Sequence, residues 1–170
     1  MFNGSIVAMV TPFKDGEVDY DKLGELVQYH IDNGTNAIIP CGTTGESPTL
    51  THREHGEVIG KVIEAAAGRI PVIAGTGSNN TSEAVSMTRH AKETGADGSL
   101  IITPYYNKPT QQGIYEHYKA ILEEVDIPII IYNVPSRTGV SISAETVARL
   151  AEFDNIVAIK EATGDIDQAS

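Results

Sequence analysis

The sequence predicts an α/β fold of the TIM (β/α)8 barrel type, of which it supplies the first six strand-helix units. Short apolar runs recur about every 30 residues, and a helical pattern follows each of them, as in strand-helix units. The strands are apolar throughout, which is typical of a parallel sheet covered by helices. A doubly wound open sheet is the competing architecture, but the first strand-helix turn, residues 11–16, lacks the G-x-G-x-x-G of dinucleotide folds. These observations favour the barrel.

The predicted elements follow from local signals. Apolar, β-rich runs predict strands over residues 5–10, 37–40, 71–74, 99–103, 128–133 and 156–160. Capping residues and helical spacing predict helices that end at Asn33-Gly34, start at the capping box Thr51 to Glu54, extend from near Thr81 to Gly95, cover about 110–125, start at Ser143, and start near Asp165.

The length of the chain is the main departure from a barrel. A complete TIM barrel needs eight strands and about 250 residues, whereas this chain has 170. We expect residues 1–170 to form an incomplete TIM-barrel catalytic domain, without the last two strands and the C-terminal helical region. An open sheet of this kind exposes two edges. A non-catalytic half-barrel is therefore an alternative to an enzyme.

Composition excludes several classes of function. A formal net charge of -11 argues against a nucleic-acid surface or binding to an anionic membrane, since both need clustered Lys and Arg. A single cysteine, Cys41, cannot form an internal disulfide, and we expect it to be a small buried hydrophobe. The sequence has no run of eighteen apolar residues and no signal-peptide pattern at its start, so we expect a cytoplasmic protein.

The strand over residues 156–160 carries the most reactive candidate, Lys160. With a period of two, Ile156, Ala158 and Lys160 share one face and the two residues between them share the other. An amine in apolar surroundings has a lowered pKa, and the neutral amine is a nucleophile for Schiff-base chemistry with a carbonyl substrate. The alternative is a strand-end lysine that reaches solvent or pairs with Glu161.

Hydroxyl groups collect after the other strands. Residues 41–47 combine glycines with Thr43 and Thr44 and suit a small carboxylate. A tight turn whose Ser and Thr side chains satisfy local backbone groups is an interpretation at least as well supported. Residues 75–80 fit an anion nest, but a structural strand-to-helix turn is the favoured interpretation.

Tyrosines and one arginine follow the later strands. Tyr105 and Tyr106 follow the fourth strand, Tyr132 is the last residue but one of the fifth, and Arg137 comes five residues later. A phenol beside an amine can transfer protons, and an arginine can hold a carboxylate in a bidentate contact. The alternatives are tyrosines that fill the mouth of a core and a solvated arginine.

The remaining candidates are two histidines and a glutamate on predicted helices. His52, His55 and Glu83 are able to bind a metal or a small charged ligand, but their spacing favours a surface role without a ligand. The strand ends contain no Ser/His/Asp set and no metal-type histidine cluster.

Four motifs then agree with one known family: GTTGES at 42–47, PYYN at 104–107, YNVPSRTG at 132–139 and IKEATG at 159–164. In order and spacing the whole chain resembles the dihydrodipicolinate synthase family, within the N-acetylneuraminate lyase and class I pyruvate aldolase superfamily. The resemblance implies a homotetrameric lyase, a dimer of dimers, of lysine and diaminopimelate biosynthesis. It condenses pyruvate with L-aspartate 4-semialdehyde and needs no metal or organic cofactor.

The resemblance also implies roles for single residues. Lys160 forms the imine with pyruvate, Tyr132 donates and accepts protons, and Thr43 and Tyr106 complete the proton relay. Tyr106 reaches across a dimer interface into the neighbouring site. The two substrate-binding residues are Thr44, for the carboxylate of pyruvate, and Arg137, for that of the semialdehyde.

Two further implications concern specificity and regulation. Sialic acid lyases and keto-deoxy-sugar aldolases share the lysine and the tyrosine, but Arg137 within SRTG favours the dihydrodipicolinate branch. The resemblance also implies a feedback site for L-lysine, in which Glu83 pairs with the ligand's ammonium group and Asn79 and Tyr105 bind its carboxylate. The residues that match this site are Ser47, Pro48, His52, His55, Asn79, Glu83 and Tyr105. Pro48 stands where an alanine is common.

Overall fold

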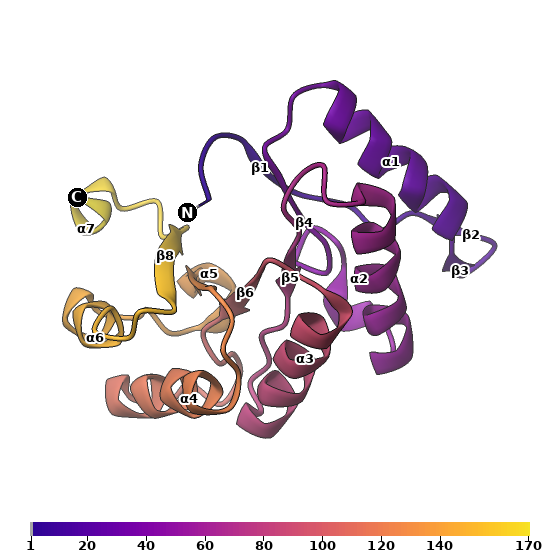
Figure 1. Ribbon diagram of the computed structural model, residues 1–170. Coiled ribbons are helices and arrows are strands. Elements are labelled where there is room, and N and C mark those ends of the chain that lie inside the picture. Colours follow the sequence, from indigo (N-terminus) through magenta and orange to yellow (C-terminus); the bar gives the residue numbers. More distant parts are fainter. Residues whose placement is uncertain (1) are drawn as a thin grey trace. The chain divides into compact units, whose positions relative to one another are not determined.

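A computed structural model describes residues 2–170 and confirms the α/β class of the first six strand-helix units of a TIM barrel (Figure 1). The chain divides into two compact units, residues 1–75 with 90–98 and residues 76–89 with 99–170. All six predicted strands are present, with ends that lie at most two residues from the sequence prediction.

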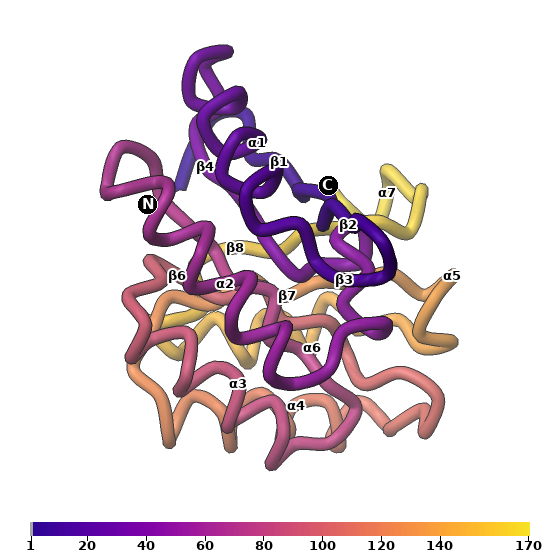
Figure 2. The backbone as a smooth tube through the Cα atoms, turned by 90° about the vertical axis from the view of Figure 1, so that its right-hand side faces the viewer, coloured from indigo at the N-terminus to yellow at the C-terminus, as the bar shows by residue number. Residues whose placement is uncertain are grey.

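The first unit contains the first three of these strands. Strand β1 (Ile6–Ala8) pairs in parallel with β4 (Ala37–Ile39), and Ile38 forms a parallel bridge with Val72, next to β5 (Ile73–Gly75). An antiparallel hairpin that the sequence did not predict, β2 (Phe13–Lys14) with β3 (Glu17–Val18), precedes the first helix (Figure 2). Its two-residue turn is Asp15-Gly16, with φ of 53° and 90°, and Asp-Gly is a favoured pair for such turns.

The helices of the first unit cover one continuous core. Helix α1 (Tyr20–Asp32) lies beside α2 (His52–Ala66), and both bury an apolar stripe. Cys41 is buried in this core, as predicted, and burial raises the pKa of its thiol to about 12. The core consists of Met9, Val18, Leu23, Val27, Ile38, Cys41, Val58, Ile59, Val62, Ala66, Val72, Ala74 and Ala91.

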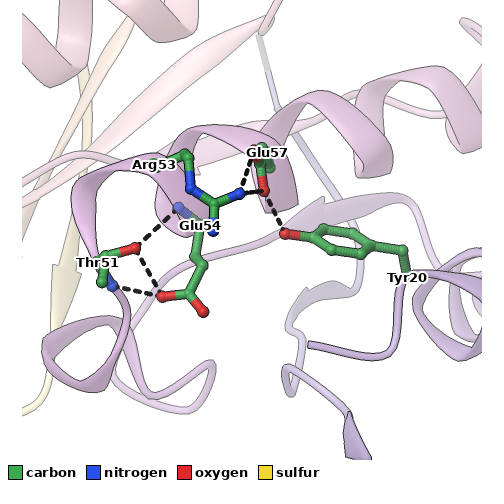
Figure 3. A network of polar contacts seen from close by, with 5 residues as sticks. All are labelled: Tyr20, Thr51, Arg53, Glu54 and Glu57. Carbon is green, nitrogen blue, oxygen red and sulfur yellow. Dashed lines mark hydrogen bonds and ion pairs between the residues drawn. The ribbon is translucent and has the colours of Figure 1, made fainter. Parts of the chain in front are cut away.

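The start of α2 is fixed by the predicted capping box (Figure 3). The Thr51 hydroxyl accepts a hydrogen bond from the Glu54 backbone N-H at 3.2 Å, and the Glu54 carboxylate accepts one from the Thr51 N-H at 2.8 Å. One turn later, Glu57 accepts hydrogen bonds from Arg53 at 2.8 Å and from the Tyr20 hydroxyl at 2.7 Å. Because Tyr20 is the first residue of α1, this contact ties the two helices together.

The second unit is built on three parallel strands, β6 (Gly98–Ile102), β7 (Ile129–Asn133) and β8 (Ile156–Glu161). Its helices are α4 (Gln111–Glu124), α5 (Pro135–Thr138), α6 (Ala144–Leu150) and α7 (Ile166–Ala169), while α3 (Thr81–Thr94) begins in this unit. Arg149 of α6 lies over the ring of Tyr115 of α4, 3.9 Å from its centroid, so these two helices are neighbours. Helix α5 and a 3-10 turn, Ser47–Thr49, were not predicted.

The pairing of β7 with β8 contains a shift of register. Ile129 lies opposite Ile156, but Ile130 lies opposite Ala158, so β8 holds one extra residue, Val157. Beyond it, Ala158 and Lys160 face the same side as Ile130 and Tyr132, because directly paired residues share a face. The prediction that Ile156 shares this face is therefore wrong. Ile156 instead faces the side of Ile159, whose side chain is 38% exposed.

Within residues 2–170, none of the helices combines the length and the apolar character required to cross a membrane. The same residues contain no group of three or more His, Cys, Asp or Glu side chains arranged to hold a metal ion.

A buried histidine of α4, His117, makes the stability of the fold depend on pH. His117 is only 4% exposed, its Nδ1 lies 2.9 Å from the Thr81 hydroxyl, and its Nε2 has no hydrogen-bond partner among residues 2–170. Burial lowers the pKa of His117 to about 4, because the charged ring cannot be solvated. The folded protein therefore holds this histidine neutral.

We expect the free energy of unfolding to fall between pH 6.5 and pH 4, and His117→Gln to remove part of this loss. In the unfolded chain this histidine has a pKa near 6.5, whereas in the folded chain it binds a proton only at about pH 4. The contribution of the neutral His117 to the free energy of unfolding is therefore fully present above pH 6.5 and is lost as the pH falls toward 4. Urea unfolding should show that the wild type loses about 2 kcal/mol more than the variant between pH 7 and pH 5. Equal losses would contradict a neutral buried His117.

Candidate active site

The centre of the candidate site is the pair of Lys160 and Tyr132 in the second unit. Tyr132 of β7 and Lys160 of β8 are direct partners in the sheet, and the Lys160 Nζ lies 4.5 Å from the centroid of the Tyr132 ring. Tyr132 is buried, with 8% of its surface exposed. Parallel pairing beyond the extra residue Val157 thus brings an amine and a phenol to the same face of neighbouring strands.

Burial changes the chemistry of this amine. Lys160 is half-buried, and desolvation lowers its pKa below the ordinary value for lysine. The face of the tyrosine ring attracts the ammonium form and opposes this effect. A larger fraction of neutral amine near neutral pH makes Lys160 a better nucleophile toward a carbonyl carbon.

The alternative in which Lys160 pairs with Glu161 does not hold. Successive residues of a strand point to opposite faces, and the Glu161 carboxylate accepts hydrogen bonds from the Asn133 side chain at 2.9 Å and from the Thr163 backbone N-H at 2.9 Å. Within the described chain, no ion pair joins Lys160 to Glu161.

The segment after β6 presents Tyr106 outward. Tyr106 is 89% exposed and has φ of 70°, a left-handed conformation that is uncommon for a residue with a side chain. The loop is anchored through Asn79, whose side-chain amide donates to the Tyr105 carbonyl at 3.2 Å and whose own carbonyl accepts from Asn107 at 3.2 Å. An exposed phenol on an anchored loop can serve a group outside this chain.

Arg137 lies on the single turn of α5, which follows β7 directly. Val134 is buried, Pro135 opens the turn, and Gly139 closes it with φ of 74°. The side chain of Arg137 is exposed, so its guanidinium group is accessible to a carboxylate.

The turn that carries Thr43 and Thr44 belongs to the first unit. Its backbone is held by the Thr11 hydroxyl, which donates to the Gly45 carbonyl at 2.7 Å, and by the Glu46 N-H, which donates to the Thr43 carbonyl at 3.1 Å. Neither Thr43 nor Thr44 uses its hydroxyl in a hydrogen bond within residues 2–170, and Thr44 is exposed. These two hydroxyls therefore do not satisfy the backbone of the turn, and both remain available to a ligand.

Residues 75–80 form a structural strand-to-helix turn, as the sequence favours. The hydroxyls of Thr76 and Thr88 lie 2.8 Å apart, and Ser78 donates to the Glu83 carboxylate while accepting from the Asn80 N-H at 3.1 Å. A Cβ on Gly77 would lie 2.5 Å from the Ile102 nitrogen, so only glycine fits there. These polar groups are used within the fold rather than for an anion.

The predicted surface role is wrong for His55. It is 6% exposed, because it lies on the stripe of α2 that also buries Val58, Ile59 and Val62, and its carbonyl accepts from the Cys41 thiol at 3.6 Å. The spacing of three and four residues to these apolar positions was the signal that would have predicted its burial. His52, the first residue of α2, is exposed as expected.

The other residues assigned to the lysine site fall in both units. Ser47 and Pro48 lie in the 3-10 turn Ser47–Thr49, half-buried and exposed respectively, in the first unit. Asn79, Glu83 and Tyr105 belong to the second unit, where Glu83 occupies the first turn of α3. The amide of Asn79 already donates to the backbone of Tyr105.

Comparison with known proteins assigns this chain to a family. The model of the dihydrodipicolinate synthetase family matches residues 1–170. The chain belongs to this family. It is 64% identical over 171 residues to the 4-hydroxy-tetrahydrodipicolinate synthase of Aquifex aeolicus (strain VF5), and the match covers 100% of this chain and 58% of that relative. The chain thus spans less than two thirds of the length of the curated relatives it matches.

Solved structures of the dihydrodipicolinate synthetase family have the same fold. The chloride-inhibited dihydrodipicolinate synthase from Acinetobacter baumannii, complexed with pyruvate, is 57% identical with a TM-score of 0.97, covering 99% of this chain and 58% of that one. The enzyme from Cyanidioschyzon merolae with lysine bound is 49% identical with a TM-score of 0.96, covering 98% of this chain and 58% of that one.

Two residues next to the site of this family member escaped the sequence analysis. Asn133 and Glu161 each follow a candidate catalytic residue, and their side chains are hydrogen bonded to each other. Their positions inside YNVPSRTG and IKEATG were the available signal.

We expect Lys160 to react with an amine-directed reagent at a lower pH than an ordinary lysine, whose pKa is about 10.4. Burial disfavours its ammonium form, so the neutral, reactive form appears earlier as the pH rises. Reductive methylation followed by peptide mapping gives the midpoint, with N-acetyl-lysine amide as the reference compound. A midpoint equal to or above that of the reference would contradict a Lys160 whose pKa is lowered by burial.

Proposed function

We propose that the protein, at its natural length, is a class I, imine-forming lyase that condenses pyruvate with L-aspartate 4-semialdehyde to give 4-hydroxy-tetrahydrodipicolinate. The observation that carries the proposal is the Lys160 amine, partly desolvated and 4.5 Å from the Tyr132 ring centroid. Membership of the family and 64% identity to a 4-hydroxy-tetrahydrodipicolinate synthase support it. In this proposal residues 1–170 are part of one TIM-barrel catalytic domain in lysine and diaminopimelate biosynthesis.

The proposed reaction starts at Lys160. Its neutral amine attacks the ketone carbon of pyruvate, Tyr132 transfers protons while water leaves, and a protonated imine forms. The imine withdraws electrons, so the methyl group loses a proton and becomes the nucleophilic carbon of an enamine. That carbon attacks the aldehyde of the second substrate, whose amine then displaces Lys160 and closes the ring. The imine is the electron sink, and the proposed steps require no metal or organic cofactor.

The other site residues take supporting roles in this proposal. Thr44 binds the carboxylate of pyruvate, consistent with its exposed hydroxyl, and Arg137 binds that of the semialdehyde. Thr43 and Tyr106 relay protons to and from Tyr132. The exposure of Tyr106, 89%, supports a role in the site of a neighbouring subunit, and we propose a homotetramer built as a dimer of dimers in the cytoplasm.

The alternatives are less well supported. Both a sialic acid lyase and a keto-deoxy-sugar aldolase would share Lys160 and Tyr132, but an accessible Arg137 suits a small carboxylated aldehyde, and the curated relatives carry the synthase name. A non-catalytic half-barrel would leave the partly desolvated amine beside Tyr132 without a use.

We also propose that L-lysine binds at a separate regulatory site and inhibits the enzyme. The solved structure from Cyanidioschyzon merolae with lysine bound supports this for a member of the same family. In the proposal the Glu83 carboxylate attracts the side-chain ammonium of lysine, and Asn79 and Tyr105 bind its carboxylate. The remaining members of the site are Ser47, Pro48, His52 and His55.

Borohydride trapping tests the imine. Pyruvate plus sodium borohydride should add one pyruvate-derived group to the protein, and peptide mapping should place it on Lys160. Lys160→Ala should lose the adduct, and Tyr132→Phe should form it about 100-fold or more slowly, since general acid-base catalysis contributes about that much. Incorporation that persists in a folded Lys160→Ala protein would refute the assignment.

Calorimetric titration tests the regulatory site. Lysine should bind the tetramer with a saturable heat, and Glu83→Gln should weaken that binding at least tenfold, because the variant loses the charge that faces the ligand's ammonium. Pyruvate trapping at Lys160 serves as the control, since it should persist in Glu83→Gln. The absence of a saturable heat with the wild type would remove the proposal.

A further inference from the structure

The extra residue in β8 decides which side chain faces Tyr132. Ile129 pairs with Ile156, but from Ile130 onward every partner in β8 is shifted by one residue. Without this shift, Ile159 would lie opposite Tyr132, and Lys160 would lie opposite Asn133 on the other face, because a slip of one residue inverts every side chain of a strand. Contacts between β7 and β8 after Val157 must therefore stabilise the shifted register.

The side chains of Asn133 and Glu161 form a clamp at the far end of the same strands. They are direct partners in the sheet, one residue beyond Tyr132 and Lys160. The Asn133 amide nitrogen donates to the two Glu161 carboxylate oxygens at 2.9 and 3.2 Å. The same carboxylate accepts from the Thr163 N-H at 2.9 Å, and the Asn133 carbonyl accepts from the Ala162 N-H at 2.9 Å.

Asn133 is in turn held by the segment that leads to α6. Its side chain is fully buried, with its Oδ1 accepting from the Ile142 N-H at 3.2 Å and its Nδ2 also 3.2 Å from the Ser141 hydroxyl. In the unshifted register Glu161 would lie opposite Val134, and the buried amide would lose its charged acceptor, which is costly for a buried polar group. The clamp therefore favours only the shifted register.

Two glutamines keep this segment in place. Gln111 of α4 donates to the Ser141 carbonyl at 2.8 Å and accepts from the Ser143 N-H at 2.9 Å. Gln168 of α7 donates to the Ile142 carbonyl at 3.3 Å. The contacts of Gln111 come from α4 and are independent of β8. Asn133 can therefore act as the fixed point against which β8 is aligned.

We infer that Asn133 and Glu161 are positioning residues that fix the shifted register of β8 and thereby place the Lys160 amine beside Tyr132. The inference rests on the proposed function, in which Lys160 forms an imine with pyruvate. Neither residue touches the reacting atoms, since both side chains lie on the face opposite to the Lys160 amine. Their effect on the reaction is exerted through the backbone of the two strands.

The inference is tested in the protein at its natural length by moving the carboxylate to position 133 and the amide to position 161. Asn133→Asp alone places two carboxylates side by side, and borohydride trapping of pyruvate should slow at least tenfold. Adding Glu161→Gln restores a donor opposite an acceptor, because the new glutamine can donate to the introduced aspartate and still accept from Thr163. The double variant should trap pyruvate within threefold of the wild-type rate.

Hydrogen exchange supplies a measurement that does not depend on activity. The amide of Ala162, which bonds to the Asn133 carbonyl, should exchange faster in Asn133→Asp and return to the wild-type rate in the double variant. Glu161→Met provides a second test if Asn133→Asp does not fold, since it adds no repulsion and leaves Asn133 its contact with Ser141; it too should slow trapping at least tenfold. Glu152→Gln, an exposed carboxylate on the same unit, is the matched control and should match the wild type in both measurements.

The outcomes separate this inference from the proposed function. Rescue of both trapping and Ala162 protection in the double variant supports the clamp. A folded double variant that traps no faster than Asn133→Asp, or a Glu161→Met protein that traps at the wild-type rate, would overturn it. If the wild type itself traps no pyruvate on Lys160, the proposed function fails, whereas the Ala162 amide still shows whether the clamp holds the register.

Discussion

The pairing of β7 with β8 is the constraint on which the candidate site depends. In a parallel sheet, partners share a face and their neighbours point the other way, so one alignment decides the contents of both faces. Here it puts Tyr132 and Lys160 together on one face and Asn133 and Glu161 together on the other. The reactive face and the polar clamp are consequences of the same backbone geometry.

The amine and its surroundings show how the local fold adjusts reactivity. Burial removes water from Lys160 and lowers its pKa. The ring of Tyr132 attracts the ammonium form and so acts in the opposite direction on this pKa. The nearest carboxylate in sequence, Glu161, would raise that pKa if it faced the amine. Its bonds to Asn133 and Thr163 keep it on the other side, so it does not raise the pKa of the amine.

The sequence predicted the strands and the capped helices because these depend on local patterns. Thr51 with Glu54, and Ser143 ahead of α6, formed the expected caps. The extra residue in β8 was missed because alternation was extended through Val157, and nothing in one strand's sequence reveals its alignment with a neighbour. His55 is buried because it lies on the apolar stripe of α2, which the predicted surface role did not take into account. The hairpin β2–β3 was missed because two-residue strands carry too short a pattern.

The buried Cys41 has a practical consequence for chemistry on this protein. Only the thiolate attacks alkylating reagents, and a thiol whose pKa is raised to about 12 is almost entirely protonated near neutral pH. Its position in the core also blocks access for a bulky dye. Fluorescent or spin labels can thus be attached to a cysteine introduced on the surface while the native one is left in place.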